Sequence, residues 1–369
     1  MVNKVKISKL PLENIDWEPI VTVLGEANRQ LARFDGTLRG IPSPQVLLSP
    51  LTTREAVLSS RIEGTQASLG EVLEFEAEQG KSDQEPETER EKDIQEIINY
   101  RRAMDHAVEE LENRPISLNL IKRLHFILLD SVRGQNKARG EFRKEQNWFG
   151  PPGCSIEEAT YIPPDWQKAH ELMENLEKYI HEDDKDVLVQ LAVVHAQFEL
   201  IHPFWDGNGR VGRMLVPLHL YEKGILSRPM FYVSAYLEAN REEYYDRLLN
   251  ISEKGDWSGW IKFFLSAVRE QANENTGKAQ EVISLYDAMK TKIVDLTGSK
   301  YSIQILDAIF SHPFFTTPLI VQWSGVPKSS VSRIFKTLRE NGVLETVREG
   351  KGRSPTIMTF PELIEIIEN

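Results

Sequence analysis

Residues 202–213, HPFWDGNGRVGR, place a histidine, one carboxylate, several glycines and two arginines within one short stretch. Gly207, Asn208 and Gly209 stand directly before a predicted helix, where backbone N–H groups can turn toward an anion and the helix N-terminus adds partial positive charge. Arg210 and Arg213 lie about one turn apart at the start of that helix, so each guanidinium can contact phosphate oxygens. The stretch therefore predicts a phosphate-binding site.

The same stretch contains candidates for metal binding and for proton transfer. Asp206 is the only carboxylate in the loop, and a Mg²⁺ ion that bridges phosphates needs such an oxygen ligand. His202 precedes the glycines and can accept a proton from an incoming hydroxyl near neutral pH. A different hypothesis is a histidine metal cluster, and we rank it low because histidines on apolar helical faces are more often satisfied core residues. The histidines concerned are His125, His195, His202 and His219.

The elements around this stretch are predicted to form a helix-loop-helix. Val187, Leu191, Val194 and Phe198 follow helical spacing before it, and RVGRMLVPLHLY continues as a helix after it. The proline and glycines of HPFWDGNG interrupt the two helices. In this setting the sequence resembles the Fic family, whose signature is H-P-F-x-[D/E]-G-N-G-R-x-x-R, and all nine constrained positions match.

The resemblance implies an enzyme that transfers AMP from ATP to a Tyr, Ser or Thr hydroxyl of a protein. It assigns His202 as the base, Asp206 as the Mg²⁺ ligand and the arginines to the triphosphate, with attack on the α-phosphate and release of pyrophosphate. In Doc-type relatives, which transfer phosphate, a lysine stands where this chain has Gly209, so AMP transfer is favoured. The nucleotide-binding residues implied by the motif are Phe204, Gly207, Asn208, Gly209, Arg210 and Arg213.

Two segments outside the motif resemble parts that contact substrates in the family. Residues 142–163 resemble the hairpin flap that pins a target segment by strand addition beside the active site. The string YLEANREEYYDRLL, residues 236–249, resembles the helix start that surrounds adenine. Asn240 and Tyr244 are the candidates there, although aromatic residues at this spacing are often simple core residues.

A third segment resembles an inhibitory element of the family. SSRIEGT, residues 59–65, fits the pattern [S/T]-x-x-x-E-[G/N] with Ser59, Glu63 and Gly64. The resemblance implies that Glu63 pairs with Arg213, occupies the space of the ATP γ-phosphate and so inhibits the enzyme. Removal of AMP with a water molecule aligned by Glu63 stays open as an additional reaction.

The sequence predicts a mainly α fold with a β-hairpin flap. We expect an N-terminal helical region at 1–90, with the inhibitory helix at about 52–64, a catalytic core at 91–275, a linker helix at 276–298 and a winged helix-turn-helix at 299–369. Capping-box patterns are present at Thr52–Glu55 and Ser68–Glu71. Core and linker are expected as separate helices at 256–274 and 278–296.

The C-terminal region favours a second hypothesis, in which the chain is a DNA-binding regulator and its core senses nucleotide. Residues 327–353 hold seven basic and three acidic side chains, whereas the whole chain has a net charge of −12. Lys328, Arg333, Lys336 and Arg339 of the expected recognition helix could contact phosphates. Winged helices also bind proteins, so both kinds of partner stay open.

The composition bears on the location and the partners expected for the protein. The sequence has no apolar stretch near the roughly 20 residues that span a bilayer and no secretory signal, so we expect no membrane partner and a cytoplasmic location. Cys154 is the only cysteine and is interpreted as structural. The target protein, self-modification and assembly as a homodimer stay open.

Overall fold

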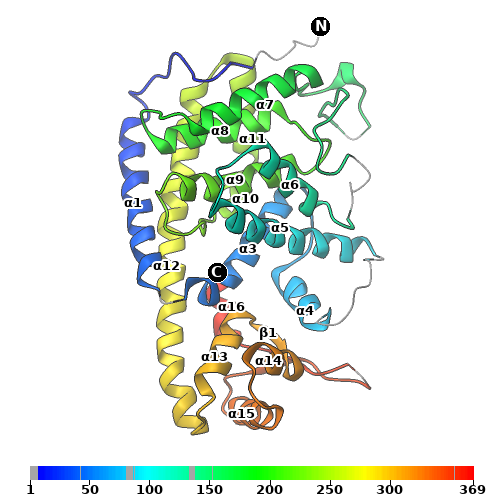
Figure 1. The fold of residues 1–369 in the computed structure, drawn as a ribbon, viewed down its shortest axis with the longest axis vertical. Coiled ribbons are helices and arrows are strands. Elements are labelled where there is room, and N and C mark those ends of the chain that lie inside the picture. Colours follow the sequence, from blue (N-terminus) through cyan, green and yellow to red (C-terminus); the bar gives the residue numbers. More distant parts are fainter. Residues whose placement is uncertain are drawn as a thin grey trace.

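The computed structural model describes residues 7–41, 43–79, 86, 88–132, 138–151, 153–352 and 354–369. Most of these residues lie in helices, and the described strands form a single small sheet near the C-terminus. The predicted mainly α class is confirmed (Figure 1). Within the described ranges, no helix combines the length and the apolar character needed to cross a membrane.

The N-terminal region is helical, as predicted. Its apolar positions recur at helical spacing, and α1 buries one such face alongside α12 (Figure 1). The segment that bears Glu63 follows α3, whose side chains are buried on most sides, so α3 crosses the interior rather than the surface. The helices are α1 (Val21–Gly40), α2 (Pro44–Leu47), α3 (Ser49–Ile62) and α4 (Leu69–Gln79).

One of the two predicted capping boxes is confirmed. The Ser68 N–H donates to Glu71 Oε2 at 2.8 Å and the Glu71 N–H donates to Ser68 Oγ at 3.3 Å, which satisfies two groups at the start of α4. The Thr52–Glu55 box is wrong, because α3 begins earlier at Ser49 and Thr52 lies inside it. Its hydroxyl instead lies 2.8 Å from the Tyr232 hydroxyl.

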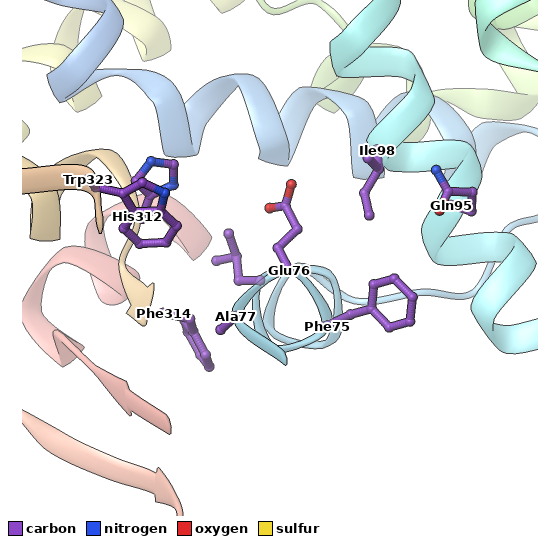
Figure 2. Close-up of a pocket in the computed structure, with 9 residues that line it drawn as sticks. Phe75, Glu76, Ala77, Gln95, Ile98, His312, Phe314 and Trp323 are labelled. Carbon is purple, nitrogen blue, oxygen red and sulfur yellow. The ribbon is translucent and has the colours of Figure 1, made fainter. Parts of the chain in front are cut away.

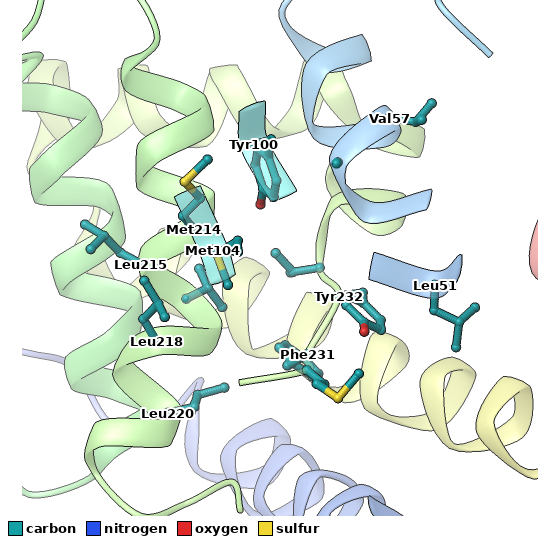
Figure 3. Packing of buried hydrophobic residues seen from close by; sticks show 14 of the residues in the cluster. Leu51, Val57, Tyr100, Met104, Met214, Leu215, Leu218, Leu220, Phe231 and Tyr232 are labelled. Atoms are coloured by element: carbon teal, nitrogen blue, oxygen red, sulfur yellow. The ribbon is translucent and has the colours of Figure 1, made fainter. Parts of the chain in front are cut away.

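The catalytic core expected from the sequence is a bundle built around α8 and α9. Helix α8 is rich in apolar residues and is buried along nearly its whole length. Figure 3 shows Met214 and Leu218 of α9 on the side toward Tyr100 and Met104 of α5. The helices are α5 (Glu89–Leu111), α6 (Leu118–Leu128), α7 (Trp166–His181), α8 (Val187–Ile201), α9 (Asn208–Glu222), α10 (Ser234–Ala239) and α11 (Arg241–Lys254), with a short 3₁₀ turn at Ile156–Glu158.

Helix α12 (Trp257–Thr297) is continuous over 41 residues and runs along most of the molecule (Figure 1). The expected break between helices at 256–274 and 278–296 is therefore wrong. Gly277 lies inside the helix, where a glycine costs only about 1 kcal/mol. Packing against α1 on one half and against α13, α15 and α16 on the other outweighs that cost.

The C-terminal unit contains the three short amphipathic helices and the terminal hairpin that the sequence predicts. Its antiparallel sheet has the order β1-β3-β2, with Met358 of β3 opposite both Phe315 and Thr346. The unit packs on α2, α3, α4 and α12. Its assignment as a winged helix-turn-helix stays a prediction. The elements are α13 (Ser302–Ser311), β1 (Phe314–Thr316), α14 (Thr317–Ser324), α15 (Lys328–Glu340), β2 (Glu345–Arg348), β3 (Ile357–Thr359) and α16 (Pro361–Glu368).

Candidate active site

The loop between α8 and α9 brings the motif residues into one turn. His202 ends α8 in the left-handed conformation with φ 49°, and Gly207 has φ 73° immediately before α9. A glycine adopts such a φ without steric cost, whereas histidine adopts it only with support from its surroundings. The first backbone N–H groups of α9 have no partner within the helix, so the loop ends at an N-terminus suited to an anion.

Two residues predicted to bind nucleotide hold the loop in shape with their side chains. Asn208 Oδ1 accepts the Phe204 N–H at 2.8 Å, and Asn208 Nδ2 donates to the Phe204 carbonyl at 2.9 Å. The Phe204 ring is fully buried and stacks on His125 with ring centroids 3.8 Å apart. Both side chains are therefore already engaged, so Phe204 and Asn208 can contact a nucleotide only through their backbone atoms.

His125 fixes the carbonyl of Asp206, a role that the sequence analysis missed. Its Nδ1 accepts the Gly140 N–H at 2.9 Å, so the ring proton lies on Nε2, which donates to the Asp206 carbonyl at 3.0 Å. Burial lowers the pKa of His125 to about 4, which keeps this neutral tautomer at neutral pH. Its place on an apolar helical face resembled that of an ordinary core histidine.

His202 is oriented by its neighbours so that Nε2 is left to accept a proton. Its Nδ1 lies 3.3 Å from the Glu199 carbonyl, which can only accept, so Nδ1 carries the proton. Arg143 donates from Nε to the His202 carbonyl at 3.0 Å, and the Phe149 ring lies edge-on to the imidazole at 4.3 Å. Burial lowers the pKa of His202 to about 4, so the ring is neutral at pH 7.

Asp206 and Arg210 form an ion-paired group with Glu96, a residue that the sequence analysis did not single out. Arg210 donates from Nη1 to Glu96 Oε2 at 2.5 Å and from Nη2 to Asp206 Oδ1 at 3.3 Å. Asp206 Oδ1 also accepts the Gly207 N–H at 2.7 Å. Arg210 Nε is buried and has no hydrogen-bond partner among the described residues. The guanidinium is thus held beside the loop with one donor left for a further acceptor.

Arg213 connects the motif to the predicted inhibitory segment. Its Nε donates to Ser59 Oγ at 2.8 Å, and its Nη2 donates to the Ser59 carbonyl at 2.8 Å and to Glu63 Oε1 at 2.6 Å. The Arg213 side chain is 1% exposed and that of Glu63 is 32% exposed. The structure therefore brings together three predicted residues that lie far apart in the sequence.

Glycines on both segments permit this contact. A β-carbon at position 209 would overlap Glu63 Oε1 and would lie 2.9 Å from Arg213 Nη1. Gly64 has φ 97°, which turns the chain away directly after Glu63, the residue that follows the last turn of α3. Burial alone would raise the pKa of Glu63, but the Arg213 guanidinium outweighs it and the pKa lies below its ordinary value. Glu63 is thus ionised at neutral pH.

A second carboxyl group, Glu199, lies beside the same arginine and was missed by the sequence analysis. Its Oε1 is buried without a hydrogen-bond partner among the described residues and would be overlapped by a β-carbon at Gly212. Burial raises the pKa of Glu199 to about 8, although Arg213 opposes the shift. Of Glu63 and Glu199, only Glu63 is therefore fully ionised at pH 7.

The adenine candidates occupy different environments. Tyr244 is 1% exposed and its hydroxyl lies 3.0 Å from His195 Nε2, which makes its side chain part of the core. Asn240 is half-buried and donates to the Tyr236 carbonyl at 2.9 Å. The neighbouring Tyr245 is 43% exposed, and its pKa is raised to about 12 by partial burial and by the Glu63 carboxylate. Of the two adjacent tyrosines, Tyr245 is thus the exposed one, a distinction that the repeated tyrosine in the sequence does not make.

The expected flap is less regular than a hairpin. Among the described residues of 142–163, which leave out 152, one antiparallel bridge joins Phe149 to Tyr161, and the Phe149 N–H donates to the Tyr161 carbonyl at 2.9 Å. Gly150, Pro151 and Gly153 lie between the two bridged residues, and neither residue type favours strand pairing. Trp148 and Phe149 are exposed here, and Phe149 lies against His202. The segment therefore presents apolar surface beside the candidate base.

The alternative of a histidine metal cluster gains no support from these positions. His125 binds the Asp206 carbonyl and His195 binds the Gly212 carbonyl at 3.1 Å. His219 is buried with both ring nitrogens unpartnered among the described residues. Among the residues that the structure describes, no group of three or more potential metal ligands is found.

The environment of His202 generates a prediction that does not depend on activity. We expect the ring to titrate near pH 4 rather than near the ordinary histidine pKa of 6.5, because burial disfavours the charged form. The ring is then neutral at pH 7 and becomes protonated only on acidification through about pH 4. Histidine NMR would show this midpoint for the resonance that disappears in His202→Ala, with circular dichroism as the check on folding. A midpoint at or above 6.5 would contradict the buried geometry.

Comparisons with known proteins agree with the motif. Residues 21–109 match the Fic/DOC family N-terminal model and residues 115–220 match the Fic/DOC family model, which together cover just over half of the chain. A probable protein adenylyltransferase of Aquifex aeolicus is 28% identical over 201 residues, 53% of this chain and 56% of that protein. The protein adenylyltransferase Fic of Drosophila mojavensis is 24% identical over 165 residues, 42% of this chain and 30% of that protein.

Solved structures share the fold. A Fic family protein from Desulfovibrio desulfuricans matches with a TM-score of 0.58 and 19% identity, covering 95% of this chain and 98% of that one. A Fic domain containing signaling protein from Bacteroides thetaiotaomicron matches with a TM-score of 0.53 and 19% identity, covering 70% of this chain and 97% of that one. With the two family models and the motif geometry, these matches show that the chain belongs to the Fic/DOC family.

Proposed function

We propose that this protein transfers AMP from ATP to a hydroxyl side chain of a protein, and that Glu63 holds it inactive at rest. The observation that carries the proposal is the contact of Arg213 with Ser59 and Glu63 directly above the N-terminus of α9. The relatives named as protein adenylyltransferases support the reaction class.

The residues around the loop fit a nucleotide with its metal ion. Arg213 Nη1 and Arg210 Nε are buried donors without partners among the described residues, and phosphate oxygens are the acceptors that such donors bind best. Asp206 offers a carboxylate, 32% exposed, at the same end of α9. In the proposed reaction Asp206 would hold Mg²⁺, which when bound neutralises phosphate charge. Tyr245 would flank the adenine ring of the nucleotide.

The protein groups then have separate tasks in the proposed transfer. His202 Nε2 accepts the proton of the target hydroxyl while that oxygen attacks the α-phosphorus, and pyrophosphate leaves. The α9 N–H groups and Arg210 bind phosphate oxygens whose charge grows in the transition state. Phe149 and Trp148 of the flap offer apolar contact to the target segment. Glu63 on Arg213 blocks the position that the terminal phosphate needs.

The inhibition is tested by Glu63→Gly, which we expect to raise the initial rate of AMP transfer strongly. Arg213→Ala should be slow, and the double variant should resemble it, because Arg213 acts on the nucleotide once Glu63 is gone. Labelled-ATP transfer for wild type and the three variants measures this. Gln66→Gly is the matched control, since it loosens the same turn without touching Arg213. A Glu63→Gly variant no faster than wild type overturns the inhibition.

The role of His202 is tested in the Glu63→Gly background. His202→Ala should lower AMP transfer at least about a hundredfold, the usual contribution of a general base. Binding of ATP should stay nearly unchanged, because the imidazole takes a proton from the hydroxyl and does not bind the nucleotide. Transfer assays paired with calorimetry would separate the two effects. Unchanged transfer would remove His202 from the mechanism.

The role of Asp206 is tested by the Mg²⁺ dependence of the rate. Asp206→Ala should shift half-saturation to much higher Mg²⁺ or abolish activity, since no second carboxylate lies in the loop. Initial rates over a range of Mg²⁺ concentrations, again with Glu63→Gly as the parent, give the answer. Full activity of the variant at ordinary Mg²⁺ would mean that the ion is bound elsewhere.

A further inference from the structure

The outward face of α15 is a basic surface that the fold does not use. Its apolar face, with Val331, Ile334, Phe335 and Leu338, is buried against the C-terminal unit and α12. The opposite face projects into solvent at the end of the molecule farthest from α7 (Figure 1). Exposed on α15 are Lys328, Ser329, Ser332, Arg333, Lys336 and Arg339.

The basic side chains on this face make few ion pairs with the rest of the described protein. Among the described residues, Lys328, Arg333 and Arg339 have no carboxylate within 4 Å, and Lys336 has only Glu340 at 3.8 Å. Such exposed pairs contribute little to folding stability. The surrounding residues 327–353 are basic although the chain as a whole has a net charge of −12. A concentration of cations against the overall charge fits a polyanionic partner.

We propose that the outward face of α15 binds duplex DNA, and that this binding competes with the contact between β2 and α4. A lone helix with hydroxyl and basic side chains on one face fits the major groove, which is about 12 Å wide. Helix α14 and the turn at Gly325, with φ 66°, precede α15 in the arrangement by which a helix pair presents its second helix to DNA. The β2–β3 hairpin follows α15 in the chain.

The competition arises at Arg348 of β2. This arginine is ion-paired with Glu74 at 3.6 Å and also with Glu78, both on α4. Phosphates near the hairpin would attract Arg348, whereas they would repel the two glutamates. Helix α4 follows directly on the turn that carries Glu63. Displacement of α4 would therefore act on the inhibitory segment, a consequence that rests on the proposed inhibition.

The contact between α4 and the C-terminal unit is loosely packed, so its separation is inexpensive. Figure 2 shows Ala77 of α4 next to Phe314, whereas Glu76 faces an opening toward His312 and Phe75 points to the other side of α4. A cavity of about 310 Å³ lies between α4 and the C-terminal unit. The apolar cluster that joins the two parts is small and consists of Ala77, Leu319 and Ile357. Close packing would have stabilised a permanent interface.

Binding is tested with the 369-residue chain and a fluorescent duplex pool of random sequence. We expect anisotropy to report binding that weakens steeply with salt, because cations on the protein replace counterions on DNA. Replacing Arg333 and Lys336 together by glutamine should weaken binding about tenfold and lower the salt slope by about two. The matched control replaces Lys168 and Lys178 of α7 by glutamine, with the same change in net charge. No binding at low salt, or equal loss in both double variants, overturns the proposal.

Coupling is tested by replacing Glu74 and Glu78 together by glutamine. This variant should bind the duplex pool several-fold more tightly and transfer AMP faster, whereas replacing the exposed Glu253 and Glu171 should do neither. By reciprocity, saturating duplex should accelerate transfer by wild type. The coupling is overturned if Glu63→Gly accelerates transfer but neither duplex nor the α4 variant does. That outcome leaves the inhibition by Glu63 intact. Without activation by Glu63→Gly, only the inhibition fails, and the binding test still decides the DNA surface.

Discussion

The Arg213 guanidinium is the point on which the arrangement of this protein depends. It lies on the second turn of α9, is almost fully buried, and donates to a hydroxyl, a carbonyl and a carboxylate of one short segment. A buried charge without partners is strongly destabilising, so α3 must be present and must end where it does. Position 209 must also stay free of a side chain, because the Glu63 carboxylate fills that space. The site and its proposed inhibitor are thus one packed unit.

The candidate base depends on a second set of buried contacts. His202 is held at φ 49°, a conformation that costs a non-glycine residue about 1 kcal/mol or more. Arg143, itself fully buried, offsets this by donating to the carbonyls of His202, Glu145 and Pro164. The flap and the end of α8 are therefore joined by one side chain. The geometry of His202 and the position of the flap cannot change independently of each other.

Sequence reasoning identified the motif and its glutamate partner, because both are patterns whose residue types state their chemistry. Which of two neighbouring side chains is buried could not be predicted in the same way. Tyr244 and Tyr245 are adjacent and identical, and the packing of α11 on α8 and α12 decides which ring is buried. The continuity of α12 and the false cap at Thr52 have the same origin, since local signals were overridden by tertiary contacts. Glu96 and Glu199 are ordinary glutamates until their burial is known.

The difference between Glu63 and Glu199, which both interact with Arg213, determines how the resting state can be left. Burial raises the pKa of Glu199 to about 8, so this group stays largely protonated and cannot neutralise the guanidinium at pH 7. If Glu63 moves away, Arg213 is left as a buried cation without an ionised partner, which the folded protein tolerates poorly. The proposed release therefore has to be an exchange, in which a phosphate of the nucleotide replaces the carboxylate. An event at α4 would then act by shifting the balance of this exchange, since it changes the position of Glu63 but supplies no anion to Arg213.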